Sequence, residues 1–263
     1  KSETNLKLLN VKPANAYPRA TDHIKEMRVI IAKLKARGLA YDAEDGTYFA
    51  IAKYKAYGKL SGLKKRQLMP GARVDVDAYD KQSPADFALW KGPLNLKPDT
   101  LNMPTGRPGW HIECSAMSRK YLGQPFDIHT GGVDLIFPHH ENEIAQSAGA
   151  YGTPLARYFL HNEHLLVDGK KMAKSEGNYV TLRDVVDKGF DPLALRYLFL
   201  SVHYREKMNF TWESLTAAEE ALRHIRQTVQ RSSAVVCSTV AQEKVQGEIE
   251  AALADDLSIP KAL

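Results

Sequence analysis

An alternation of strand-like and helix-like patterns in the second half of the chain constrains the fold most strongly. The short strand pattern "FDIH" is followed by two glycines and then by a helix that we expect to start at Pro138. Further strand patterns fall within residues 155–169, and a buried helix is predicted over residues 191–205. A long amphipathic helix follows over residues 212–231. Strands that alternate with helices predict an α/β sheet, with helices alone after it.

The first half of the chain opens with a helix pattern and a hairpin pattern. Residues 20–38 show helical periodicity, and Gly38 provides a C-terminal stop. Residues 40–51 contain two short strand patterns around Asp45–Gly46, which predicts a β-hairpin. Residues 53–105 are rich in lysine, proline and glycine. We expect them to form the short strands and loops of an insertion rather than part of a core.

The composition favours a cytoplasmic protein without a membrane segment. Of the 263 residues, 44% are hydrophobic and 25% are charged, which is ordinary for a globular protein. The formal net charge of +5 suits a polyanionic partner without requiring one. Two cysteines, Cys114 and Cys237, cannot build a disulfide framework, which favours a reducing compartment. No stretch approaches the roughly 18 consecutive apolar residues of a membrane span, and the start has no signal-peptide pattern.

The stretch "FPHHENEIAQS" is a candidate metal site. His139 and Glu143 are four residues apart and therefore share one face of a helix. An imidazole and a carboxylate are suitable zinc ligands, and Cys114 in "WHIECSAMS" offers a thiolate. The same residues also fit a solvated helix start with a buried small cysteine. The spacing alone leaves both interpretations open.

The stretch "KKMAKSEGN" is a candidate phosphate site. Lys171 and Lys174 flank a Met-Ala pair, and a glycine follows them. Two lysines in a glycine-flanked loop can offset the charge that develops on a triphosphate during reaction. A solvated basic turn has the same composition, so this pattern also leaves both interpretations open.

The stretch "IHTGGVD" places a glycine pair, Gly131 and Gly132, between a predicted strand and a predicted helix. Such a pair lets the backbone approach a ligand closely. Many strand-to-helix turns use glycine without binding anything, so the pattern is weak by itself.

Taken together, these stretches resemble one family. "KKMAKS" resembles the KMSKS signature of class I aminoacyl-tRNA synthetases, with Ala173 at the variable middle position. "GRPGWHIECSAMS", "FDIHTGGVDLIFPHHENEIAQS" and "HYREKMNFTWESL" closely resemble cysteinyl-tRNA synthetases. The resemblance runs from Tyr17 to the end of the chain. It implies an α/β fold: the second half of a Rossmann-type class I catalytic domain with a connective-peptide insertion, followed by the start of an α-helical bundle.

The resemblance also implies a division into domains. Residues 1–105 would hold the remainder of the first catalytic half and the insertion, and residues 106–220 the second half with the KMSKS-like loop. Residues 221–263 would begin a truncated helical domain similar to the DALR domain. The HIGH signature, the family's first zinc cysteine and the anticodon-binding region are missing, and Cys237 cannot replace that cysteine. We therefore expect a fragment of a longer protein.

The resemblance assigns roles to individual residues. His140 and Glu141 would serve packing or face solvent. The residues with assigned roles are Cys114, His139 and Glu143 as three of four zinc ligands, Trp110, His129 and Asp134 as substrate-binding residues, Gly131, Gly132 and Lys174 as ATP-binding residues, and Lys171 and Lys174 as catalytic residues.

The implied function is a cysteine–tRNA ligase. It would activate L-cysteine with ATP and transfer it to the 3′ end of tRNA(Cys), as a cytoplasmic monomer. One Zn²⁺ per chain would select the cysteine thiol, and Mg²⁺ would accompany ATP. Two alternatives stay open: a cysteine ligase of mycothiol biosynthesis, and a catalytically incompetent zinc- or tRNA-binding fragment. The isolated chain is expected to be inactive.

Overall fold

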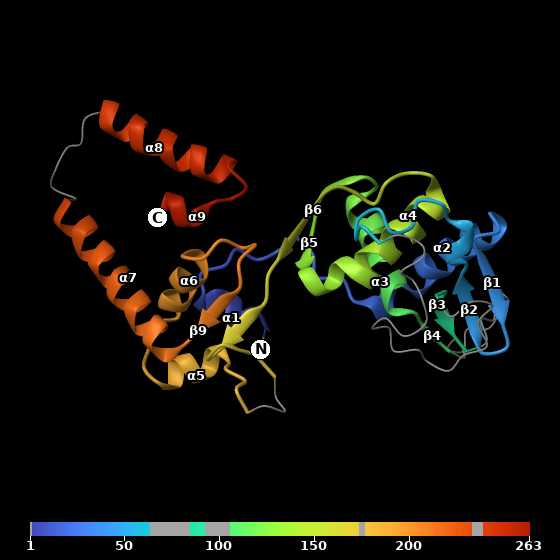
Figure 1. The fold of residues 1–263 in the computed structure, drawn as a ribbon, viewed down its shortest axis with the longest axis horizontal. Coiled ribbons are helices and arrows are strands. Elements are labelled where there is room, and N and C mark those ends of the chain that lie inside the picture. Colours follow the sequence, from blue (N-terminus) through green and yellow to red (C-terminus); the bar gives the residue numbers. More distant parts are fainter. Residues whose placement is uncertain (1, 64–84, 93–105, 174–176, 233–238) are drawn as a thin grey trace. The chain divides into compact units, whose positions relative to one another are not determined.

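The computed structural model describes residues 2–63, 85–92, 106–173, 177–232 and 239–263. These residues form two compact units, one of Ala16–Leu160 and one of Lys1–Asn15 with His161–Leu263 (Figure 1). The division at residues 105 and 220 expected from the sequence stays a prediction. Within the described residues, no helix combines the length and the apolar character that crossing a membrane requires.

Three helices form the core of the unit Ala16–Leu160. Helix α2 (Ile24–Ala36) packs against α3 (Trp110–Leu122) and α4 (Glu141–Tyr151). A single 3₁₀ turn, Ala20–His23, precedes α2, and Gly38 with φ +70° ends the helical segment. The helix predicted over residues 20–38 is therefore confirmed. The fully buried side chains of α2 face the core because they recur at helical spacing: Met27, Ile30, Ile31 and Leu34.

A four-stranded antiparallel sheet with the order β1-β2-β3-β4 lies in the same unit. The predicted hairpin is present, but Ala43 pairs with Gly46, so the turn is one residue earlier than expected. A Cβ atom at Gly46 would lie 2.3 Å from the Trp90 carbonyl oxygen, so this glycine allows close approach of the next strand. The strands are β1 (Ala40–Ala43), β2 (Gly46–Phe49), β3 (Phe87–Lys91) and β4 (Arg107–Pro108), and a 3₁₀ turn spans Ile51–Lys53.

Strand β3 corrects one expectation. Residues 53–105 were expected to lie outside the core, yet Leu89 and Trp90 of β3 are fully buried. Both belong to the same apolar cluster as α2. The expectation is wrong for β3, because a short apolar strand contributes to the core whatever the composition around it. Residues 64–84 and 93–105 of this stretch lie outside the described residues.

Strand β5 (Phe126–Gly132) pairs with β6 (Ala156–Asn162), and helix α4 lies between them in the sequence. Single helical turns over Val133–Leu135 and Ile136–His140 connect β5 to α4. Phe137 keeps an extended backbone (φ −134°, ψ 132°), as expected for a residue that precedes proline. The regular helix consequently begins at Glu141, later than the predicted start at Pro138.

The second unit contains a three-stranded sheet with the order β8-β7-β9. Strand β7 pairs antiparallel with β8 and parallel with β9. The predicted buried helix and the long amphipathic helix are present as α6 and α7, which pack against each other. The elements of this unit are α1 (Ser2–Leu8), β7 (Leu165–Val167), β8 (Lys170–Lys171), α5 (Leu182–Asp187), α6 (Pro192–Leu200), β9 (Met208–Phe210), α7 (Trp212–Ser232), α8 (Thr239–Ala254) and α9 (Ile259–Ala262).

Candidate metal and substrate site

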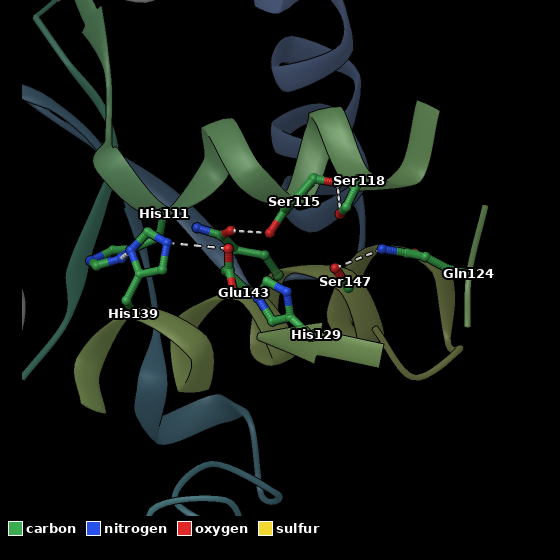
Figure 2. A network of polar contacts seen from close by, with 9 residues as sticks. His111, Ser115, Ser118, Gln124, His129, His139, Glu143 and Ser147 are labelled. Atoms are coloured by element: carbon green, nitrogen blue, oxygen red, sulfur yellow. Dashed lines mark hydrogen bonds and ion pairs between the residues drawn. The ribbon is translucent and has the colours of Figure 1, made fainter. Parts of the chain in front are cut away.

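The first turn of α3 is fixed against the sheet by a glycine. The backbone N–H of Gly109 donates to the Leu89 carbonyl at 2.9 Å. A Cβ atom at position 109 would lie 2.1 Å from the Ala88 carbonyl oxygen, so only glycine allows the helix to begin there. Helix α3 is also tied to α4, because the Ser115 hydroxyl donates to Gln146 Oε1 at 2.7 Å (Figure 2). The side chains at the start of α3 are therefore held in place.

The structure brings together the three predicted zinc ligands of this chain. Ligand atoms of Cys114, His139 and Glu143 all lie within 4.8 Å of one another. His139 and Glu143 are buried, and Cys114 is partly buried. Helix α3 supplies the thiol, the turn Ile136–His140 before α4 supplies the imidazole, and the first turn of α4 supplies the carboxylate. Three donors of the types that zinc binds thus lie around one point.

The two oxygens of Glu143 have different surroundings. Oε2 accepts a hydrogen bond from His129 Nε2 at 2.6 Å. Oε1 lies 3.2 Å from His139 Nε2, close enough for an ion pair, yet it is buried without a hydrogen-bond partner among the described residues. A buried oxygen without a partner costs free energy, and a bound cation would remove that cost. The donor set therefore fits a metal ion at Oε1.

The pKa values of the same groups agree with this fit. Burial raises the pKa of Glu143, but the contacts and charges of His129 and His139 outweigh it and hold the pKa at about 2. Burial, followed by the negative charge of Glu143, raises the pKa of the Cys114 thiol to about 12. Without a metal the thiol keeps its proton at neutral pH. A zinc ion would displace that proton, because thiolate is the form that ligates metals.

His111 is a residue that the sequence analysis missed. Its Nδ1 lies 2.9 Å from Nδ1 of His139 (Figure 2). Burial, with a smaller contribution from His139, lowers the pKa of His111 to about 4, so this ring is neutral at pH 7. When His111 accepts the proton of His139 Nδ1, the lone pair of His139 Nε2 points toward Glu143 and a metal. The signal was available, since His111 precedes Cys114 by three residues and shares its helix face.

Trp110 lies at the exposed edge of this cluster. Its side chain is 58% exposed, and its ring centroid is 4.4 Å from that of His139. The ring therefore borders the predicted metal ligands on their exposed side. Its predicted role in binding the substrate stays a prediction.

The end of β5 contributes His129 and Gly131 to the cluster. The ring centroid of His129 lies 4.2 Å from that of His140, with the two ring planes tilted by 40°. A Cβ atom at Gly131 would lie 2.8 Å from His140 Cε1, so this glycine makes room for a buried imidazole. Gly132 leads into the turn Val133–Leu135, where Asp134 is exposed. The predicted ATP contacts of the glycines and the substrate contact of Asp134 stay predictions.

His140 and Glu141 are both 1% exposed, so they pack inside the protein and do not face solvent. The Glu141 carboxylate accepts hydrogen bonds from the backbone N–H of Gly58 at 2.8 Å and of Ser61 at 2.9 Å. His140 also forms a second set with His129 and Glu143 whose ligand atoms lie within 4.8 Å of one another. Glu143 belongs to both sets, which makes it the central charge of the site.

The KMSKS-like stretch lies in the second unit. Lys171 is exposed at the end of β8, and Lys174 lies outside the described residues, as does Cys237. The backbone N–H of Ala173 donates to Asn178 Oδ1 at 2.9 Å. Asn178 Nδ2 in turn donates to the Lys171 carbonyl at 3.1 Å. The catalytic roles of the two lysines stay predictions.

Comparison with protein families identifies the chain. Residues 1–220 match the model of the class I tRNA synthetase (C) catalytic domain. The chain therefore belongs to the family of class I tRNA synthetase (C) catalytic domains.

Curated relatives agree with this family. The chain is 46% identical over 273 residues to a cysteine–tRNA ligase of Leptospira interrogans, covering 98% of this chain and 58% of the relative. It is 49% identical over 267 residues to a cysteine–tRNA ligase of Opitutus terrae, covering 97% of this chain and 57% of the relative. The chain thus spans less than two thirds of the length of these relatives.

Solved structures show the fold. A methionyl-tRNA synthetase of Mycobacterium tuberculosis in complex with methionyl-adenylate matches with a TM-score of 0.67 and 14% identity, over 99% of this chain and 65% of that chain. A putative arginyl-tRNA synthetase of Campylobacter jejuni matches with a TM-score of 0.56 and 16% identity, over 98% of this chain and 54% of that chain. The class I synthetase catalytic fold predicted from the sequence is confirmed.

Proposed function

We propose that this protein is a cysteine–tRNA ligase that activates L-cysteine with ATP and transfers it to tRNA(Cys). The observation that carries the proposal is the convergence of ligand atoms of Cys114, His139 and Glu143 within 4.8 Å of one another. Relatives that are 46% and 49% identical and bear the name cysteine–tRNA ligase support it. The basic charge of the chain suits a nucleic-acid partner.

Selection of cysteine over serine is the chemical problem at this site. The two amino acids differ by one atom, and a pocket that reads shape alone separates such analogues by only about 10- to 200-fold. Zinc held by Cys114, His139 and Glu143 would supply a preference for sulfur and stabilise the substrate as a thiolate. The protein's own contribution is to hold the carboxylate charged, to orient the imidazole through His111, and to limit the pocket with Trp110.

Activation requires a second set of groups. The carboxylate of cysteine attacks the α-phosphorus of ATP, the bond to the bridging oxygen breaks, and pyrophosphate leaves with that electron pair. Lys171 and Lys174 would offset the charge that develops, together with Mg²⁺ bound to ATP. His129, Asp134, Gly131 and Gly132 would line the adenylate. A ribose hydroxyl at the 3′ end of tRNA(Cys) then attacks the activated carbonyl and releases AMP.

The experiment that tests this function is ATP–pyrophosphate exchange followed by tRNA charging. The protein should be expressed from its full reading frame and supplied with cysteine or serine at matched concentrations. We expect exchange with cysteine at least about 1000-fold above exchange with serine, beyond what shape alone supplies. We expect tRNA(Cys) to be charged with cysteine when no amino-sugar is present as an alternative acceptor. Transfer of the activated cysteine to an amino-sugar, with tRNA left uncharged, would contradict the proposal. The protein should act as a monomer in the cytoplasm.

A further inference from the structure

The hairpin that carries Lys171 is fixed by a two-residue turn. Val167 pairs with Lys170, so Asp168 and Gly169 alone form the turn between β7 and β8. Their φ angles are +51° and +74°, the combination of a type I′ turn. The Gly169 backbone N–H donates to Asn209 Oδ1 on β9 at 2.7 Å. The start of the lysine-bearing stretch therefore has a defined backbone position.

A second asparagine acts on the other side of the same stretch. Asn178 accepts from the backbone N–H of Ala173 and donates to the carbonyl of Lys171, at 2.9 Å and 3.1 Å. One side-chain amide thus bonds to two backbone groups on either side of Met172. Only a group that donates and accepts at once can make both bonds, which asparagine can do and aspartate cannot.

The residue between those two bonds faces inward. Met172 packs against the apolar cluster of the second unit, whereas Lys171 is exposed. Met172 directly follows β8, so its packing against the cluster holds the backbone next to the exposed Lys171. The two asparagines and Met172 together determine where the lysine backbone lies.

We propose that Asn178 is a positioning residue that fixes the backbone of Lys171 and Ala173 for the adenylation step. The proposal rests on the proposed function, because it assigns the step in which the lysine charge is needed. A lysine displaced by about 1 Å from the developing charge loses much of its effect on rate, with little change in substrate binding. Asn178 itself need not touch the substrate.

The test uses the variants Asn178→Asp and Asn178→Ala in the protein expressed from its full reading frame. Asn178→Asp keeps the acceptor and loses the donor, whereas Asn178→Ala loses both. We expect kcat for cysteine-dependent pyrophosphate exchange to fall about 10-fold for the first and about 100-fold for the second. KM for cysteine should stay within twofold, and the midpoint of thermal unfolding should stay near that of the wild type. Gln246→Ala removes an exposed amide bonded to Glu250 on α8 and serves as the matched control.

A kcat within twofold of the wild type, or a loss that follows a fall in the unfolding midpoint, would overturn the proposal. Failure of the proposed function looks different, because the wild type itself would then show no exchange with cysteine. In that case the positioning role is tested by the rate of deuterium uptake at the Ala173 backbone amide, which needs no enzymatic activity. Faster uptake in Asn178→Ala than in Gln246→Ala supports the positioning role, and equal uptake overturns it.

Discussion

The cluster around Glu143 and the hairpin around Lys171 hold their charges in opposite ways. Glu143 is 1% exposed and contacts the imidazoles of His129 and His139. A third imidazole, that of His111, contacts His139. Lys171 is exposed, and backbone contacts made by Asn178 fix its position. A buried charge with packed partners is orientated before any ligand arrives, which suits selection of a substrate atom. An exposed lysine on a defined backbone stays free to meet a polyphosphate.

The largest effect should follow from removing the central charge of the buried cluster. In Glu143→Ala, His129 and His139 lose their buried partner, and the free energy of unfolding should fall by about 3–5 kcal/mol. Bound zinc should be lost as well. Urea denaturation and metal analysis measure the two effects, with Glu248→Ala on the exposed surface of α8 as the control. An unfolding free energy and a zinc content equal to those of the wild type would contradict this assignment.

The same residue gives a pH dependence for the metal-free protein. The pKa of Glu143 is about 2 in the folded protein, below its ordinary value of 4.5. Its contribution to stability is therefore present above pH 4.5 and is lost as the pH falls toward 2. As the pH falls from 4.5 toward 2, the free energy of unfolding should therefore decrease less in Glu143→Ala than in the wild type.

Cys114→Ser should separate selection from ATP binding. The hydroxyl is a poor zinc ligand, so kcat/KM for cysteine should fall about 100-fold or more, while KM for ATP changes less than about threefold. Pyrophosphate exchange measured against each substrate gives both numbers. Equal losses for cysteine and ATP would mean that Cys114 supports the fold and does not select the substrate.

Lys174→Ala tests the lysine-bearing stretch that follows the hairpin around Lys171. A lysine that acts on developing charge should affect the rate more than binding, so kcat for exchange should fall about 100-fold with a modest change in KM for cysteine. Lys244→Ala, on the exposed surface of α8, provides a control that removes a lysine elsewhere in the same unit. An unchanged rate in Lys174→Ala would make the stretch an ordinary basic turn.

The smallest effect is expected at His111. His111→Phe keeps an aromatic ring packed near Phe87 but removes the nitrogen that bonds His139. Zinc affinity should fall about 10- to 100-fold, as for other partners that orientate a metal-binding histidine. A competition titration with a zinc chelator measures it, and His224→Phe on the exposed side of α7 is the control. Unchanged affinity would show that His139 needs no such partner.

Much of the buried cluster could be anticipated from the sequence, for physical reasons that differ between residues. His139 and Glu143 are four residues apart in the sequence and form a contact at 3.2 Å, so local spacing was sufficient to pair them. Cys114 lies on another helix, and spacing alone could not bring it there. The resemblance to a known family supplied that step. His111 was missed because its partner, His139, lies outside α3, in the turn before α4. The sequence did show that His111 and Cys114 share one face of α3.

The differences in the fold have local causes. The hairpin turn lies one residue earlier than expected because Gly46 is required for contact with β3 and is already paired. The core position of Leu89 and Trp90 was hidden by the lysine, proline and glycine around a short apolar strand. Helix α4 begins late because Phe137, before a proline, keeps an extended backbone. Each case depends on a contact or a backbone angle that periodicity does not report.

X-ray absorption of the bound zinc tests the central claim most directly. The spectrum counts sulfur neighbours at about 2.3 Å, the length of a zinc–sulfur bond. In the protein expressed from its full reading frame, the account predicts that adding L-cysteine raises this number by one and that adding L-serine leaves it unchanged. The Cys114→Ser variant should begin with one sulfur fewer. A sulfur count that does not change on addition of L-cysteine would contradict selection of the substrate by direct thiolate ligation.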